Sequence, residues 1–217
     1  LIIPSGYTVH SQDNVKLKFQ YDKIFLSFSP LNLKGTFSNS ITFTSKEESW
    51  GGLILINIPN DSLLESVYIS NVAGIKRSGS IVTGGITFYK SPVNIINSMF
   101  IKSYGEDLLN VFNSKINIID STFKNSLYDA IDIDFGKGNI HNSIFYNIGN
   151  DAIDLSGSNV SLSKLVIEKV GDKGISVGER SQMNGDKIEI ADSKIAVASK
   201  DKSKVNLKNL NINNCVI

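Results

Sequence analysis

The sequence predicts an all-β protein, folded as a single-stranded right-handed parallel β-helix with coils of about 22 residues and an irregular N-terminal cap. Asp107, Asp129 and Asp151 follow one another at 22 residues (129 − 107 and 151 − 129), and each opens a similar segment: DLLNV, DAIDI and DAIDL. Apolar and polar residues alternate within each segment, which is typical of strands. One unit of this length cannot bury its own apolar face, so the units must stack.

The opening section, residues 1–48, contains short runs of period 2. After a strand–turn–strand pattern over 1–19 come IFLSF (24–28), LNLKGTF (31–37) and ITFTS (41–45). Such runs are expected to be strands. We therefore expect entry coils that cap the solenoid.

Residues 49–84 hold one coil and a long Gly/Ser-containing loop at 72–84. This loop is longer than its equivalents in later coils, and departures from a repeat are where solenoids place binding functions. It carries Arg77, which we expect to contact a substrate.

Residues 85–217 form the regular body. Polar residues recur at one expected turn position, where Asn and Asp tolerate left-handed backbone and bond locally; they are Asn97, Asp120, Asn142, Lys164, Asp192 and Asn209. Two stacks of inward residues are expected to fill the bore; they are Ile86, Leu109, Ile131, Ile153 and Ile175, with Phe88, Val111, Ile133, Leu155 and Val177.

Composition favours one domain over 1–217. The net charge of +1 creates no overall positive field that would attract nucleic acid. No apolar run is long enough for a membrane span. Cys215 is the single cysteine, which excludes an internal disulfide. Because the repeat has not visibly ended at Ile217, we expect a segment of a longer chain with flanking domains.

The beginning of the chain resembles a known group. IPSGYTVH and GTFSNSITFTSKEESWGGLILIN (35–57) are similar to the entry coils of right-handed β-helix domains of bacterial secreted and surface proteins, with Trp50, Gly51 and Gly52 at their Trp-x-Gly position. The resemblance implies the pectin-lyase-like superfold and an extracellular or cell-surface location. Many functions share that superfold, so it implies no particular activity.

Alternation turns the apolar residues of 129–133 and 151–155 inward and the aspartates between them outward. Five carboxyl groups should therefore share one patch: Asp129, Asp132, Asp134, Asp151 and Asp154. The nearest bases are expected to be Lys137, Lys173 and Arg180.

Carboxylates stacked about 4.8 Å apart repel, so one must gain a raised pKa or a cation must lie between them. The first outcome suits acid–base cleavage of a glycoside by Asp132, Asp154 and Asp134. The second suits calcium held by Asp129, Asp132, Asp151 and Asp154, the one candidate cofactor. A third interpretation is a ladder that only increases solubility. Lys173, Arg180, Phe112 and Tyr89 are further candidates for substrate binding.

Known enzyme signatures of the superfold are absent. Polygalacturonases look like N-T-D, D-D, G-H-G and R-I-K, whereas DAID departs from D-D and the last two motifs do not occur. The arginine pattern of pectate lyases and the D-P-H-E of mannuronan epimerases are also missing. The sequence therefore favours a noncatalytic module that binds a polysaccharide or another surface protein. The alternatives are a polysaccharide-active enzyme (lyase, epimerase or glycoside hydrolase) and a rigid spacer.

Overall fold

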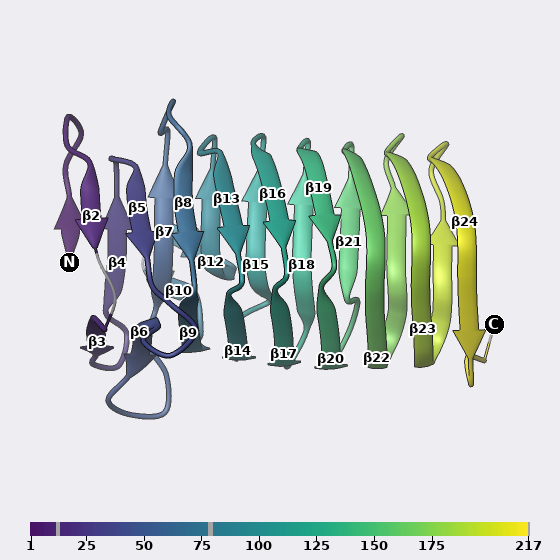
Figure 1. Ribbon diagram of the computed structural model, residues 1–217, viewed down its shortest axis with the longest axis horizontal. Coiled ribbons are helices and arrows are strands. Elements are labelled where there is room, and N and C mark those ends of the chain that lie inside the picture. The colour runs from purple at the N-terminus through teal and green to yellow at the C-terminus, as the bar shows by residue number, and fades with distance from the viewer. Residues whose placement is uncertain (12–13, 78–79, 217) are drawn as a thin grey trace.

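The computed structural model is a parallel β-helix of about 9 turns, in which successive coils stack along one axis from the N-terminus to the C-terminus (Figure 1). It describes residues 1–11, 14–77 and 80–216, with the side chains of 76–81 also left out. Each coil contributes to three faces, A, B and C. Within the described residues no helix is present, and hence none that is long and apolar enough to cross a membrane.

Face A consists of parallel strands β1 (Ile2–Ile3), β4 (Ile24–Ser27), β7 (Gly52–Ile56), β12 (Gly84–Tyr89), β15 (Asp107–Phe112), β18 (Asp129–Asp134) and β21 (Ile153–Ser156). Face B consists of β2 (Val9–Ser11), β5 (Leu31–Lys34), β8 (Ser62–Glu65), β13 (Val93–Ile96), β16 (Lys115–Ile119) and β19 (Lys137–His141). Face C consists of β3 (Lys16–Phe19), β6 (Ile41–Ser45), β9 (Val67–Val72), β14 (Met99–Ser103), β17 (Thr122–Ser126) and β20 (Ile144–Ile148).

The last coils are built from longer strands. β22 (Asn159–Gly178) and β23 (Gln182–Ser199) each pass through faces B, C and A, and β24 (Lys204–Asn213) passes through B and C. Ile131, Ile153 and Ile175 are register partners 22 residues apart (153 − 131 and 175 − 153). The expected period is confirmed.

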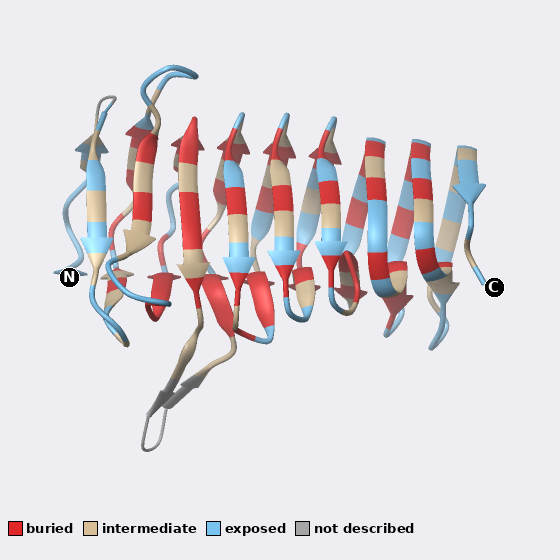
Figure 2. Ribbon diagram, turned by 90° about the horizontal axis from the view of Figure 1, so that it is seen from below, coloured by how far each residue is buried: buried red, intermediate tan, exposed pale blue. Residues whose placement is uncertain are grey.

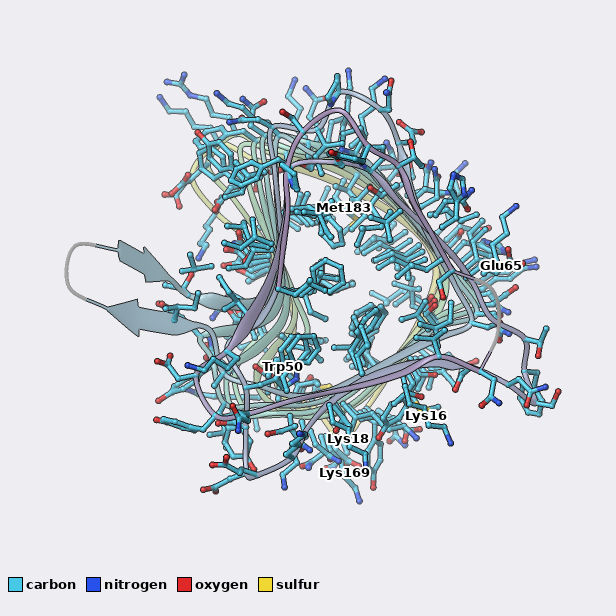
Figure 3. The ribbon with its side chains drawn as sticks, turned by 90° about the vertical axis from the view of Figure 1, so that its left-hand side faces the viewer. Lys16, Lys18, Trp50, Glu65, Lys169 and Met183 are labelled. Carbon is cyan, nitrogen blue, oxygen red and sulfur yellow. The ribbon has the colours of Figure 1, made fainter. Side chains whose placement is uncertain are left out.

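The interior is filled by equivalent side chains stacked coil upon coil (Figure 3). The two predicted apolar stacks of face A are fully buried, and buried residues alternate with exposed ones along strands such as β23 (Figure 2). Phe100, Phe123 and Phe145 stack from face C at ring distances of 5.0 and 5.1 Å. Identical apolar side chains pack well at the spacing of parallel strands.

The Trp-x-Gly motif anchors the early coils. Trp50 is fully buried, donates from Nε1 to the Ser70 carbonyl oxygen at 2.8 Å and stacks on Phe19 at 4.2 Å. Gly52 has φ +108°, and a Cβ there would lie 1.8 Å from the Gly85 carbonyl oxygen. Only glycine permits this close approach.

The predicted loop at 72–84 contains an antiparallel hairpin, β10 (Ile75–Arg77) and β11 (Ser80–Val82). It projects from the solenoid between face C and face A (Figures 2 and 3). Ile54 and its partner Thr87 are therefore 33 residues apart (87 − 54).

One turn assignment is wrong. Asn97, Asp120, Asn142, Lys164 and Asn209 all have left-handed φ angles between faces B and C, but Lys187 holds this position in the coil of β23. Asp192 lies in the next turn, between C and A, where Asn214 donates to its carboxylate at 2.5 Å. Both turns require a left-handed residue, so residue type alone did not separate them.

We expect Phe123→Ala to lower the free energy of unfolding by about 3–5 kcal/mol, because it leaves a cavity inside a three-ring stack. Denaturant unfolding followed by circular dichroism would measure the loss. Phe37→Ala is the control, since Phe37 is 94% exposed and its loss should change stability by less than about 0.5 kcal/mol. Equal effects of the two substitutions would contradict the role of the stack.

Candidate functional site

Face A carries six aspartates, of which Asp107 and Asp151 are buried. They are here called the aspartate cluster: Asp107, Asp129, Asp132, Asp134, Asp151 and Asp154. Asp107 pairs in register with Asp129, and Asp132 with Asp154. Because parallel strands lie about 4.8 Å apart, the cluster concentrates carboxyl groups on three adjacent coils.

Asp129 and Asp151 link one coil to the next. Asp129 Oδ1 accepts from the backbone N–H of Asp151 at 2.8 Å and from Asn150 Nδ2 at 2.6 Å. Asp151 Oδ1 accepts from the backbone N–H of Lys173 at 3.0 Å, and Lys173 Nζ lies 3.4 Å away. These two carboxyl groups already satisfy the N–H groups at strand entrances, which is a structural role.

Asp132 and Asp154 lie further along the same strands. Asn110 Nδ2 donates to Asp132 Oδ2 at 3.0 Å. Asp154 Oδ1 is inaccessible to solvent and has no hydrogen-bond partner within the described part of the chain. The same holds for the hydroxyl of Ser176, the register partner of Asp154, whose side chain is 0% exposed. Unpaired buried polar atoms are rare, and they point to groups that a ligand or water completes.

Burial raises the pKa of most of the cluster, and mutual repulsion adds to it. The pKa of Asp132 rises to about 8 through burial first and then through Asp107, Asp134, Asp154 and Asp129. Burial and the Asp129 carboxylate raise the pKa of Asp107 to about 7, and burial raises that of Asp129 to about 6 despite its hydrogen bonds. The pKa values of Asp134 and Asp151 also rise, mainly through burial. Asp132 therefore keeps its proton near neutral pH.

A cavity of about 220 Å³ lies on face A; its described lining contains no aspartate of the cluster but includes Asn110, which donates to Asp132, and Thr83, which donates to Asp107. The base of the hairpin lines one side through Val82 and Thr83, and the rings of Tyr89 and Phe112 stack at 5.2 Å on the surface of the sheet. Thr83 Oγ1 donates to Asp107 Oδ2 at 3.4 Å, which joins the hairpin to the cluster. The role of Tyr89 and Phe112 in substrate binding stays a prediction.

The basic residues expected near the cluster lie in different parts of the solenoid. Lys173 lies at the cluster but forms ion pairs with Asp151 and Asp172. Arg180 lies in the turn after β22, in a hollow shared with Phe135 and Asp201. The expectation for Lys137 is wrong, because β19 places it on face B. The side chain of Arg77 lies outside the described residues.

No three His, Cys, Asp or Glu side chains within the described ranges are arranged to hold a metal ion. Two of the four predicted calcium ligands, Asp129 and Asp151, already accept backbone N–H groups. The residues therefore do not fit a calcium site well, and calcium binding stays a prediction that a calorimetric titration would test.

Sequence reasoning missed Asp107, Asn110 and Thr83 as members of the site. Asp107 is the first member of the 22-residue series, and this series is the signal that could have identified it. Asn110 stands one coil before Asp132 in the same register. Thr83 reaches the cluster only because the hairpin returns to face A, which no local pattern indicates.

Comparison with known proteins supports the fold. No family model and no curated protein matches the chain. The catalytic domain of a GH87 alpha-1,3-glucanase in complex with nigerose matches with a TM-score of 0.50 and 13% identity over 99% of this chain. An alginate lyase from Paenibacillus sp. str. FPU-7 matches with a TM-score of 0.28 and 10% identity, over 94% of this chain and 99% of its own.

This chain spans about half (49%) of the glucanase domain. At this identity the likeness shows the fold alone: a parallel β-helix of the pectin-lyase-like kind, as the sequence predicted.

The raised pKa values predict a pH-dependent stability. A carboxyl group with a higher pKa in the folded than in the unfolded state binds more protons when folded, so stability falls as pH rises from about 4 to about 8. We expect Asp132→Asn to remove part of this loss and to gain about 2 kcal/mol over wild type at pH 9, with little difference at pH 4. Thermal unfolding at pH 4 to 9 would measure it.

The matched control is Glu189→Gln, which removes an exposed carboxyl group from face C. It should follow the wild-type pH profile. An Asp132→Asn profile parallel to wild type at every pH would contradict a buried, protonated Asp132.

Proposed function

We propose that this chain forms a polysaccharide-cleaving enzyme of the glycoside hydrolase type, with Asp132 as the general acid and Asp154 as the partner carboxylate. The observation that carries the proposal is the register pair itself. Asp132 and Asp154 stand side by side on adjacent strands, one with a pKa of about 8 and the other with an unbonded buried oxygen.

Glycoside hydrolysis requires two carboxyl groups, one that donates a proton to the leaving oxygen and one that assists attack on the sugar carbon. A general acid works best when its pKa lies near the working pH. The surrounding carboxylates and burial give Asp132 this property. Asn110, which donates to Asp132 Oδ2, holds the carboxyl group in one orientation.

Asp154 suits the second role because its Oδ1 has no protein partner among the described residues. That oxygen is closed to solvent, so the carboxyl group must rotate before an attacking water or the sugar carbon can reach it. Asp129 and Asp151 are less suitable, since their oxygens hold the backbone of the next coil. Asp134 adds negative charge beside the pair and helps to keep Asp132 protonated.

Charge favours a neutral polysaccharide. Six carboxyl groups share face A, and the nearby Lys173 is neutralised by Asp151 and Asp172. The carboxyl groups of the cluster that are ionised near neutral pH would repel a uronate chain. The arrangement thus favours hydrolysis of a neutral glycan over lyase or epimerase chemistry on an acidic one.

The cavity beside the cluster provides a place for the neighbouring sugars. Phe112 lies one coil and Tyr89 two coils before the strand of Asp132. Their half-buried rings stack on each other, so together they offer a sugar an apolar edge next to the acid pair. A glycan that crosses the strands would therefore contact the aromatic pair and the acid pair together. The glucanase with the matching fold binds nigerose in its structure, so alpha-1,3-glucan is the first substrate to test.

A noncatalytic module, the hypothesis that the sequence favoured, needs no carboxyl group kept protonated by its neighbours. A spacer needs no cavity. We therefore place the enzyme first and make the binding module an outcome of the test. An extracellular or cell-surface location, where polysaccharides are met, belongs to the proposal.

We expect wild type to release reducing ends from a neutral polysaccharide, tested first on alpha-1,3-glucan and then on other neutral glucans. Asp132→Asn and Asp154→Asn should each lower kcat by about 10²–10⁴, since each removes a proton-transfer or attacking group. Activity of the wild type should decline above pH 8 as Asp132 ionises. A reducing-sugar assay at pH 5 to 9 would measure these effects.

Glu189→Gln is again the control and should retain wild-type activity. Full activity in Asp154→Asn would overturn the assignment of the pair. Binding of a glycan without turnover, unchanged in both variants, would support the noncatalytic module instead.

A further inference from the structure

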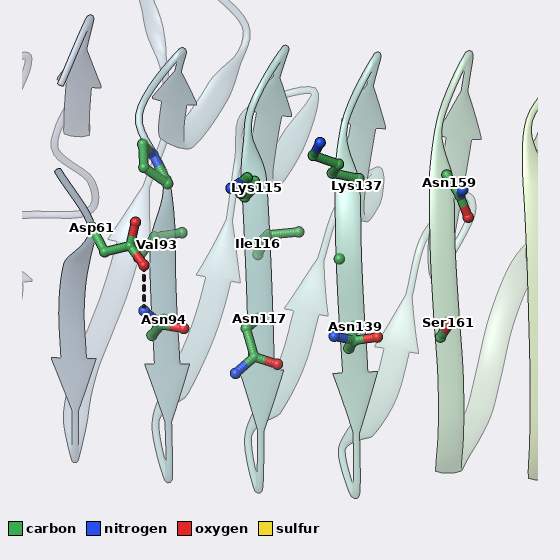
Figure 4. Close-up of a pocket in the computed structure, with 12 residues that line it drawn as sticks. Asp61, Val93, Asn94, Lys115, Ile116, Asn117, Lys137, Asn139, Asn159 and Ser161 are labelled. Carbon is green, nitrogen blue, oxygen red and sulfur yellow. Dashed lines mark hydrogen bonds between the residues drawn. The ribbon is translucent and has the colours of Figure 1, made fainter. Parts of the chain in front are cut away.

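Face B carries a groove that the proposed activity does not use (Figure 4). Two adjoining cavities of about 420 and 540 Å³ share Asp61, Pro92, Lys115, Lys137 and Asn159 in their walls. The shared walls make them one depression. It crosses β13, β16, β19 and the start of β22, so it runs across the strands over four successive coils.

Polar side chains line this groove, and some of them have no side-chain hydrogen bond to any described residue. Asn94, Asn117, Asn139 and Ser161 are register partners on the outer surface of face B. Asn94 Nδ2 donates to Asp61 Oδ2 at 3.3 Å. Asn117 and Asn139 make no side-chain hydrogen bond with any described residue, so each offers one donor group and one acceptor group to a ligand.

The charge of the groove is positive. Lys115 and Lys137 are exposed register partners on adjacent strands, and neither forms an ion pair with a described residue. Lys90 lines the same depression, and Asp61 is the one described carboxylate in its wall. Because these two lysines start from adjacent register positions, an anion bound between them would be attracted by both.

We propose that this groove binds a polysaccharide that carries carboxylate groups. Its carboxylates would pair with Lys115 and Lys137, and its hydroxyl groups would bond to Asn117 and Asn139. A repeating polymer fits because equivalent groups recur on every coil. A nucleic acid fits less well, since Phe135 is the one aromatic residue in the described lining and bases bind single-strand grooves by stacking on several.

The proposal is independent of the activity proposed for face A. The two surfaces belong to different faces and carry opposite charge, so they select different glycans. An acidic polysaccharide held on face B would tether the protein without competing for the aspartate cluster.

The test uses calorimetric titration of the whole chain with polygalacturonate fragments. Lys115→Gln/Lys137→Gln should weaken binding about tenfold, the effect expected for the loss of two exposed ion pairs. Asn117→Ala/Asn139→Ala should weaken it while the salt dependence remains. Raising the salt from about 0.1 to about 1 M should weaken wild-type binding, because the Debye length falls from about 10 to about 3 Å.

The matched control is Lys16→Gln/Lys18→Gln, which removes two exposed lysines from face C (Figure 3) and should bind as wild type does. Asp132→Asn/Asp154→Asn should also bind as wild type, which separates this site from face A. The proposal fails if wild type does not bind polygalacturonate, if the face C control loses as much affinity, or if dextran or single-stranded DNA binds equally well.

Discussion

In the regular coils of this solenoid, strand residues stack on their register partners in the next coil, about 4.8 Å away, and this in-register stacking governs the rest of the structure. Stacking like on like is favourable for apolar and aromatic side chains, as in the three phenylalanines of face C. It is also favourable for amides, which donate and accept at once, as where Asn147 donates to Asn125 at 2.8 Å. It is unfavourable for like charges, because the repeat brings them together with no partner of opposite sign between them.

The solenoid resolves this conflict differently at different positions. Asp129 and Asp151 accept hydrogen bonds from backbone N–H groups of the following coil, and these bonds offset part of the repulsion between the carboxyl groups. Asp132 has no such bond and instead retains a proton. On face B, Lys115 and Lys137 remain exposed and charged. The same stacking rule thus produces structural carboxylates, one protonated carboxyl group and a cationic groove on one scaffold.

The regular part of the fold could be predicted because it depends on local alternation and a fixed period. Ile131 and Ile153 are buried register partners because they occupy the same apolar position of the repeat in successive coils. The hairpin could not be predicted, because its two strands interrupt the repeat and it reaches face A only through the path of the backbone. The same is true of the site: the contacts set by the repeat could be predicted, and those set by the path of the backbone could not. The register placed Asp132 beside Asp154, but Thr83 joined Asp107 through the hairpin, and Lys137 moved to face B because the turn after β18 changes the direction of the chain.

Repetition also explains why residue type alone does not assign a role here. Asp129 and Asp132 lie in one strand, have the same side chain and recur 22 residues later as Asp151 and Asp154. They differ in which neighbours reach them: a backbone N–H from the next coil for Asp129, and the amide of Asn110 from the previous coil for Asp132. Repeated aspartates become chemically distinct when their neighbours differ. Asp132 accepts from the amide of Asn110 in the preceding coil, and Asp154 in the following coil has an oxygen with no partner among the described residues. These two features make Asp132 and Asp154 differ chemically from Asp129 and Asp151, although all four derive from one repeated pattern of positions.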